Sequence, residues 1–228
     1  MNAVVYYSGS GQSERIACQI AKDINFNCIN LLKTAKNEFD NLVLVFPIYC
    51  QNIPNTVKDF LKVVKCEKLS LIATYGKMSC GNALWEIQRD FNFNVIAGAY
   101  IPTAHSYIEN DIVFSDFSSL QVLYKKILIG NEKVVFPKLK KNIFANFCKD
   151  ARSRFNLKII RNNNCNFCGE CNKSCPNNAI YMGKTNKNCI RCLKCVTICK
   201  NNALTYKKGA LLKAYLKKKK VNDLIIYV

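Results

Sequence analysis

The sequence predicts an α/β protein in two parts, a doubly wound parallel sheet followed by a small cysteine-rich unit. In the first part, short apolar runs alternate with segments of helical spacing, which is typical of a parallel sheet with crossing helices. In the second part, eight of the fourteen cysteines lie between Cys165 and Cys199. Half of the 228 residues are hydrophobic, which is enough for one medium domain and one small one.

The elements of the first part follow from apolar runs and their boundary residues. Pro54 opens one helix because proline fits the first helical turn. Five strands joined by helices indicate a doubly wound sheet, whose ligands bind outside the carboxyl ends of the strands. We expect strands at 4–7, 26–31, 42–49, 69–75 and 93–99, and helices at 13–23, 54–64, 82–91 and 118–129.

The remaining segments set the expected domain boundaries. The basic stretch 133–154 is expected to carry another helix, and 211–220 an amphipathic helix before a docked segment at 224–228. We therefore expect a domain at 1–150, made of a core at 2–104 and a variable region at 105–150. The cysteine-rich domain is expected at 155–208 and a C-terminal extension at 209–228.

The N-terminus and the apolar runs predict a cytoplasmic protein with no integral membrane segment. No basic region, apolar stretch and small-residue cleavage site open the sequence, and no apolar run approaches about 18 residues. Cysteines in such a compartment are expected to be reduced, so metal ligation is the leading use for a spaced set.

The formal net charge of +19 predicts a basic surface, densest at 217–220. One explanation of this charge is compositional drift, since lysine is abundant throughout the chain. The other is an acidic redox partner protein, whose association the positive charge would steer. A membrane-surface role for 211–220 is a third reading. We expect no nucleic acid partner, because no nucleic-acid-binding motif accompanies the charge.

Two cysteine runs repeat at a spacing of 24 residues (199 − 175). Each run has the spacing C-x2-C-x2-C-x3-C, the first is followed by Pro176, and the pattern is that of four-iron clusters. Structural zinc sites also use C-x2-C pairs, but zinc gives no reason for the third cysteine or for the x3 step. The runs therefore predict two [4Fe-4S] clusters.

Residues 159 to 206 resemble the two-cluster bacterial ferredoxins, a small α+β fold. The resemblance implies that the fourth cysteine of each run binds the cluster of the other run. It also implies pseudo-twofold symmetry, with Asn178 and Asn202 opening short helices and strands. The implied ligand sets are Cys165, Cys168, Cys171 and Cys199 for one cluster, and Cys189, Cys192, Cys195 and Cys175 for the other.

Lys200 stands where the first run has Pro176. Proline fixes the backbone after a ligand, whereas lysine adds an N–H group and a cation. Our hypothesis is that Lys200 raises the reduction potential of the cluster closed by Cys199 relative to its twin.

Three loops follow predicted strands and carry the binding evidence of the first part. The loop 8–13 has two glycines and three hydroxyls before a helix start, which suits a phosphate, although it matches neither Walker A nor G-x-G-x-x-G. The loops 47–54 and 74–82 combine aromatic residues with turns at the same edge of the sheet.

With these loops, residues 2 to 104 resemble a flavodoxin-like domain of the short kind fused to a two-cluster ferredoxin. The resemblance implies FMN, with phosphate on the first loop, Tyr49 stacked on the ring, and N–H groups of Asn52 and Gly76 nearby. Related sequences often have glycine and tryptophan where this chain has Gln51 and Asn52. A scaffold without flavin is the alternative. The implied FMN-binding residues are Ser8, Gly9, Ser10, Gly11, Gln12, Ser13, Pro47, Tyr49, Asn52, Thr74, Tyr75, Gly76 and Gly81.

No catalytic residue stands out. His105 fits a structural role better than a base, Trp85 a core position, and Cys80 has no basic neighbour beyond Lys77. The combination predicts electron transfer that couples two-electron flavin chemistry to one-electron cluster chemistry. The alternative is a substrate-reducing flavoenzyme with a pocket bordered by 100–117.

Overall fold

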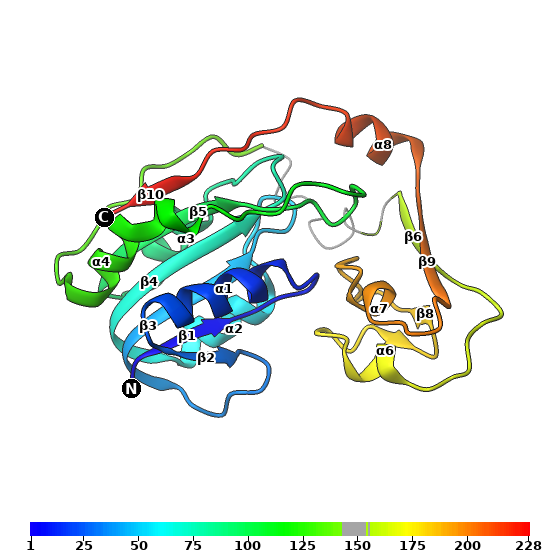
Figure 1. Ribbon diagram of the computed structural model, residues 1–228, viewed down its shortest axis with the longest axis horizontal. Helices are drawn as coiled ribbons and strands as arrows, with labels where there is room; N and C mark the ends of the chain where they lie inside the picture. The colour runs from blue at the N-terminus through cyan, green and yellow to red at the C-terminus, as the bar shows by residue number, and fades with distance from the viewer. Residues whose placement is uncertain (143–153, 155) are drawn as a thin grey trace. The chain divides into compact units, whose positions relative to one another are not determined.

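The structure is a computed structural model that describes residues 1–142, 154 and 156–228 (Figure 1). The chain forms two compact units, and each is treated by itself. The first comprises Met1–Ile143 together with Lys220–Val228, and the second comprises Phe144–Lys219.

The first unit is built on a six-stranded sheet in the order β10-β5-β4-β3-β1-β2. Every neighbouring pair is parallel except β10 and β5, which are antiparallel. The parallel strands thus run 2-1-3-4-5, an order that reverses direction between β1 and β3, and doubly wound sheets bind ligands outside the carboxyl ends of the strands at such a point. The strands are β1 (Ala3–Tyr6), β2 (Asn27–Asn30), β3 (Glu38–Pro47), β4 (Lys65–Tyr75), β5 (Val95–Pro102) and β10 (Ile225–Tyr227).

Helices cover both faces of this sheet. One apolar core joins it to α2 and α3 through side chains such as Phe60 and Leu84. A second core joins the other face to α1 and α4 through Ile16 and Leu123. Both faces of the central strands are therefore buried, as their continuous apolar runs require. The helices are α1 (Gln12–Asp23), α2 (Asn55–Val63), α3 (Ala83–Asp90), the 3-10 turn η1 (Phe117–Leu120) and α4 (Gln121–Ile129).

The expected parallel strands and helices are present, but the sheet has six strands rather than five. The added strand is β10, from the segment assigned to a C-terminal extension at 209–228, of which 220–228 belongs to the first unit. It pairs with the outer edge of β5, and the Tyr227 ring packs edge-on against Tyr100 and Phe136. Most of the helix expected within 133–154 lies outside the described residues.

The second unit is a small α+β structure. Its β6 (Leu157–Arg161) pairs antiparallel with β9 (Leu204–Lys208), and its β7 (Ile180–Tyr181) pairs with β8 (Lys184–Thr185). The short helices are α6 (Glu170–Lys173) and α7 (Lys194–Thr197), followed by α8 (Ala210–Leu216), which ends before the predicted residue 220. In the described part of the chain, no helix has the length and apolarity needed to cross a membrane.

A buried carboxylate fastens the C-terminal segment to the first unit. The Asp111 side chain is 3% exposed, and its Oδ1 lies 2.8 Å from Lys220 Nζ and 3.4 Å from Lys77 Nζ. The His105 N–H donates to its Oδ2 at 2.8 Å. Burial alone would raise the pKa of Asp111, but the Lys220 and His105 hydrogen bonds and the Lys77 charge outweigh it and lower the pKa to about 2.

We predict that Asp111→Asn destabilises the first unit by about 2 kcal/mol at neutral pH, because the depressed pKa reports that much extra stabilisation of the charged carboxylate. A depressed folded-state pKa gives stability that is present above the unfolded pKa and lost below it. The difference between wild type and variant should therefore shrink as pH falls from about 4 to about 2. Urea titrations followed by fluorescence of Trp85, the one tryptophan, measure it.

The matched control is Asp59→Asn. Asp59 pairs with Lys62 at 2.7 Å, but both side chains are more than 60% exposed, so this pair should contribute less than about 1 kcal/mol. An Asp111→Asn variant as stable as the Asp59→Asn variant would contradict the assignment of Asp111 as the fastening point.

Candidate functional site

The two cysteine runs adopt the same backbone conformation. A left-handed residue precedes each short helix, Gly169 (φ 77°) before α6 and Leu193 (φ 64°) before α7. Left-handed backbone recurs at Phe167 and Arg191, with φ of 58° at both. It recurs again at a matched pair, Asn178 and Asn202, with φ of 48° at both. Asparagine tolerates this region well, whereas Leu193 is there against its steric preference. The repeat seen in the sequence is thus a repeat of conformation.

Reciprocal hydrogen bonds join the beginning of each run to the end of the other. The Asn162 N–H, ahead of the first run, donates to the Ala203 carbonyl at 2.9 Å, and the Asn186 N–H, ahead of the second, donates to the Ala179 carbonyl at 2.9 Å. This exchange places the fourth cysteine of each run beside the first three of the other run.

Backbone donors also point at the fourth sulfur of each run. The Ala179 N–H lies 3.1 Å from Cys175 Sγ, and the Ala203 N–H lies 3.3 Å from Cys199 Sγ. Hydrogen bonds of this kind stabilise a thiolate, the form in which cysteine binds metal. The two donors occupy equivalent positions in the repeat.

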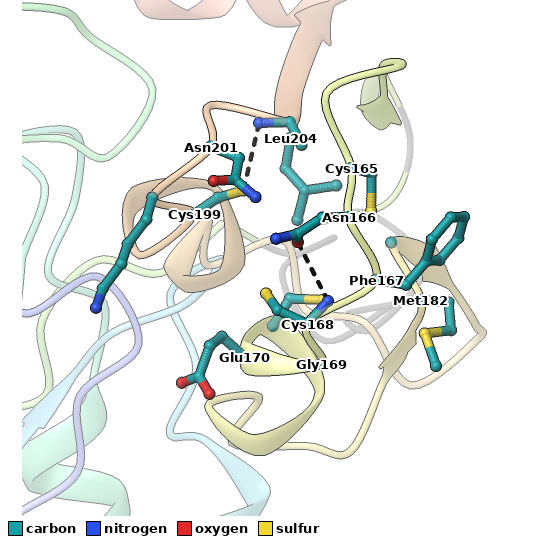
Figure 2. A pocket seen from close by; sticks show the side chains of 14 residues that line it. Cys165, Asn166, Phe167, Cys168, Gly169, Glu170, Met182, Cys199, Asn201 and Leu204 are labelled. Atoms are coloured by element: carbon teal, nitrogen blue, oxygen red, sulfur yellow. Dashed lines mark hydrogen bonds between the residues drawn. The ribbon is translucent and has the colours of Figure 1, made fainter.

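The cysteine runs line two cavities in the described part of the second unit, and the first has a volume of about 270 Å³ (Figure 2). Figure 2 shows the thiols of Cys165, Cys168 and Cys199 around it. Cys168 is exposed, and its N–H donates to Asn166 Oδ1 at 3.3 Å. The lining residues are Cys165, Asn166, Phe167, Cys168, Gly169, Glu170, Cys171, Met182, Gly183, Cys199, Lys200, Asn201, Ala203 and Leu204.

The second cavity is smaller, about 20 Å³, and its lining is more apolar. Cys189 and Cys195 are each 8% exposed. Burial raises the pKa of the Cys192 thiol to about 11 and that of Cys195 to about 12. A cationic metal is needed to deprotonate these thiols at neutral pH. The lining residues are Ile159, Cys175, Pro176, Asn177, Ala179, Ile180, Thr185, Cys189, Ile190, Cys192, Leu193, Lys194 and Cys195.

The thiols line these cavities without converging on one point. Within the described residues, no three His, Cys, Asp or Glu side chains are grouped to hold a single metal ion. The eight cysteines predicted as ligands are nevertheless divided between the cavities as two sets of four, with Cys199 in the first and Cys175 in the second.

In the first unit, the three predicted loops meet at the carboxyl edge of the sheet. Ser13 Oγ, at the start of α1, lies 2.8 Å from the Thr74 hydroxyl at the end of β4. The Ile48 N–H, just after β3, donates to the Thr74 carbonyl at 2.8 Å. The Thr103 hydroxyl donates to Gln12 Oε1 at 2.9 Å. The sheet therefore brings together loops that are distant in sequence.

The first loop ends in a left-handed residue that opens α1. Gly11 has φ 91°, and its N–H donates to Ser8 Oγ at 3.1 Å. No atom lies within 4 Å of the position a Cβ would take there, so the conformation, and not crowding, favours glycine. The helix start directs its backbone N–H groups toward this loop, as an anion site requires.

The second and third loops pack tightly on each other. Cys50 (φ 49°) and Gln51 (φ 65°) form the tip of a turn between Tyr49 and Asn52. A Cβ on Gly81 would lie 2.8 Å from the Gln51 carbonyl oxygen, so glycine is needed for this approach.

Three predicted flavin-loop residues are engaged within the protein. The Asn52 N–H, expected near a flavin ring, donates to the Tyr49 carbonyl at 2.9 Å, because the turn closes on itself. Tyr75 is 2% exposed, and its hydroxyl donates to the Asp223 carbonyl at 2.6 Å. The Thr74 hydroxyl pairs with Ser13. Tyr49 and Pro47 are half-buried at the loop surface.

Sequence reasoning missed a buried ion pair behind the second loop. Lys141 Nζ lies 2.5 Å from Glu86 Oε1 and 3.0 Å from Asn52 Oδ1, and both charged side chains are at most 13% exposed. Lys141 sits in a lysine-rich stretch, and no local signal distinguishes it from its neighbours.

The residues to which the sequence assigned no catalytic role pack against their neighbours. A Cβ on Gly76 would lie 2.8 Å from His105 Cδ2, so His105 packs directly on the third loop. Trp85 is half-buried between the cations of Arg89 (4.7 Å) and Lys138 (5.1 Å). Cys80 is half-buried, and burial raises the pKa of its thiol.

Comparisons with known proteins support the second unit. Residues 158–181 match the family model described as the 4Fe-4S binding domain, which supports at least one 4Fe-4S cluster. A comparison with curated proteins finds no match.

Two solved structures are similar to the chain at a low level. A protein described as a flavoprotein from Bacteroides uniformis is 16% identical, with a TM-score of 0.37 over 46% of this chain and 91% of its own. Trp repressor binding protein from Bacillus subtilis is also 16% identical, with a TM-score of 0.34 over 55% of this chain and 97% of its own.

Proposed function

We propose that the protein transfers electrons through two [4Fe-4S] clusters in the second unit and an FMN in the first. The observation that carries this proposal is the division of eight regularly spaced cysteines between two cavities, four to each. The family match over the first run supports the same chemistry. Cluster-bearing proteins of this kind exchange single electrons at potentials set by charge, hydrogen bonds and exposure.

The first cavity favours a cluster over a single zinc ion. Four thiolates on one zinc, with Zn–S near 2.3 Å, lie only about 3.8 Å from each other and leave no space between them. Here Cys165, Cys168, Cys171 and Cys199 surround about 270 Å³. The left-handed turns recur in the second run, and the N–H groups of Ala179 and Ala203 point at the fourth sulfur of each run. This repeat of conformation extends the cluster assignment to the second cavity.

The proposal that the first unit binds FMN is based on the three loops at the carboxyl edge of the parallel sheet. In the order 2-1-3-4-5 the first two loops follow β1 and β3, the neighbouring strands at which the order reverses and where doubly wound sheets bind ligands. Gly9, Ser10 and Gly11, with the start of α1, would hold the phosphate, and Tyr49 would cover the ring. A bound flavin supplies two-electron chemistry that can be divided into single-electron steps. Asn52, held by Lys141, positions the second loop.

The partner that fits this function is an acidic redox protein. The formal charge of +19 favours long-range attraction to such a partner, and attraction of this kind raises association rates at low salt.

We predict that protein purified without oxygen contains about eight iron and eight sulfide per chain, from two four-iron clusters, and about one FMN. Iron, sulfide and flavin assays measure this directly. A zinc-loaded protein would contradict the cluster assignment, and iron without flavin would contradict only the first-unit assignment.

A variant with an added negative charge, purified in the same way, tests whether the loop 8–13 binds the FMN phosphate. Ser10→Asp should weaken FMN binding at least about tenfold, because a carboxylate repels the phosphate across a short distance. Ser115→Asp, on the exposed segment before η1, is the matched control. Equal FMN affinities for the two variants would place the phosphate elsewhere.

Paired cysteine variants test how the ligands are shared. If Cys168 and Cys199 bind one cluster, Cys168→Ala with Cys199→Ala should retain the other cluster and about four iron. Cys168→Ala with Cys175→Ala should lose both clusters, because these residues line different cavities. Iron content and EPR signals distinguish the two proteins. The opposite pattern would mean that each run binds its own cluster.

We predict that Lys200→Gln lowers the reduction potential of the cluster in the first cavity, because removing a cation disfavours the more negative reduced state. Lys200 is exposed, so its charge interacts with the added electron through water, with an energy of about 0.5 kcal/mol at several ångströms. For a one-electron step this energy corresponds to a shift on the order of 20 mV. EPR-monitored redox titration measures it. The matched control is Lys194→Gln, which should act on the second cluster instead. Unchanged potentials in Lys200→Gln would show that the lysine has no electrostatic role.

A further inference from the structure

Two cysteines outside the repeated runs lie in contact on the first unit. Cys18 is on α1 and Cys28 is on β2, and their sulfur atoms are 2.9 Å apart. Both residues are exposed. This separation is shorter than an ordinary contact between sulfurs, and a disulfide bond of about 2.05 Å requires a further approach of only about 0.9 Å.

The surrounding fold holds the two thiols in register. Cys28 is paired with Val4 across the parallel β1–β2 ladder, which fixes the edge strand on the sheet. On either side of Cys18, Ala17 and Ile20 of α1 are fully buried in the same core as Val4. The contact between the thiols therefore follows from the packing of a helix on its own βαβ unit.

We propose that Cys18 and Cys28 form a reversible disulfide, a thiol-redox site separate from the cysteine runs and from the flavin loops. The oxidant is a low-molecular-weight disulfide, RSSR. The Cys18 thiolate attacks one of its sulfurs, which breaks the RS–SR bond, forms a mixed disulfide at Cys18 and releases RS⁻. Cys28 then loses its proton and attacks the Cys18 sulfur, and the second RS⁻ leaves. Two protein thiols lose two electrons and two protons, and RSSR becomes two RSH.

The environment of Cys28 sets this order of attack. Although Cys28 is exposed as a residue, partial burial of its thiol raises the pKa to about 12, helped by its hydrogen bond to Cys18 and by the charges of Cys18 and Glu14. Cys28 is therefore a poor first nucleophile, because the thiolate is the reactive form. Once Cys18 carries the R–S group, the hydrogen bond and charge of Cys18 no longer raise the pKa of Cys28, whereas burial and Glu14 still do. The closeness of the two sulfurs then favours the second step, because the attack is intramolecular.

The chain allows a direct test with oxidised glutathione. Trypsin cleaves after Arg15, Lys22 and Lys33, so Cys18 and Cys28 fall in separate peptides, 16–22 and 23–33. Full-length protein purified without oxygen is incubated with oxidised glutathione, alkylated with N-ethylmaleimide and digested. We expect mass spectrometry to detect the two peptides joined by a disulfide that dithiothreitol removes.

Single variants separate the proposed order from random oxidation. Cys28→Ser should accumulate glutathione on peptide 16–22, whereas Cys18→Ser should carry at least about tenfold less glutathione on peptide 23–33. Cys66→Ser, on β4, should leave the joined peptides unchanged. Wild-type protein in which both peptides carry glutathione or both remain alkylated, without the joined product, would overturn the proposal. The readout is independent of clusters and flavin.

Discussion

The second unit depends on a reciprocal exchange of two hydrogen bonds, Asn162 N–H to the Ala203 carbonyl and Asn186 N–H to the Ala179 carbonyl. Each bond joins the beginning of one cysteine run to the end of the other, so neither run can close a four-thiol cavity alone. A left-handed residue precedes α6 and α7, and three thiols of each run line the same cavity. The pairing of β6 with β9 fixes the ends of this arrangement. A change that separates the strands therefore disturbs both cavities together.

In the first unit, the order of the strands brings the candidate binding loops together. Parallel strands with helices on both faces bring their carboxyl ends to one edge, and the Ser13–Thr74 contact joins two of the loops there. Gly81 and Gly76 allow the third loop to approach the Gln51 carbonyl and the His105 ring, where a side chain would be too large. Backbone packing at these glycines thus determines the conformation of the loops.

The sequence predicted what has a local or periodic signal. The α/β alternation and the cysteine repeat are of this kind, since apolar runs report burial and x2 and x3 steps report thiol placement. The strand β10 was missed as part of the sheet because three residues, Ile225–Tyr227, have no periodicity and pair across more than a hundred positions. The contacts of Lys141 with Asn52 and Glu86, and of Asp111 with Lys220, were missed for the same reason. Long-range ion pairs have no signature in the local sequence.

The two cavities are alike in backbone conformation but differ in their surroundings. This difference bears on which of the two proposed clusters is easier to reduce. The first is about 270 Å³ and is lined by exposed Cys168 and by Phe167, which is 54% exposed. The second is about 20 Å³, with Cys189 and Cys195 buried. A cluster in a more polar and more exposed site is easier to reduce than one in an apolar, buried site, because nearby dipoles and solvent stabilise the added negative charge. If the proposed function is right, an electron in the second unit would reside preferentially in the first cavity, where a partner in solution could reach it.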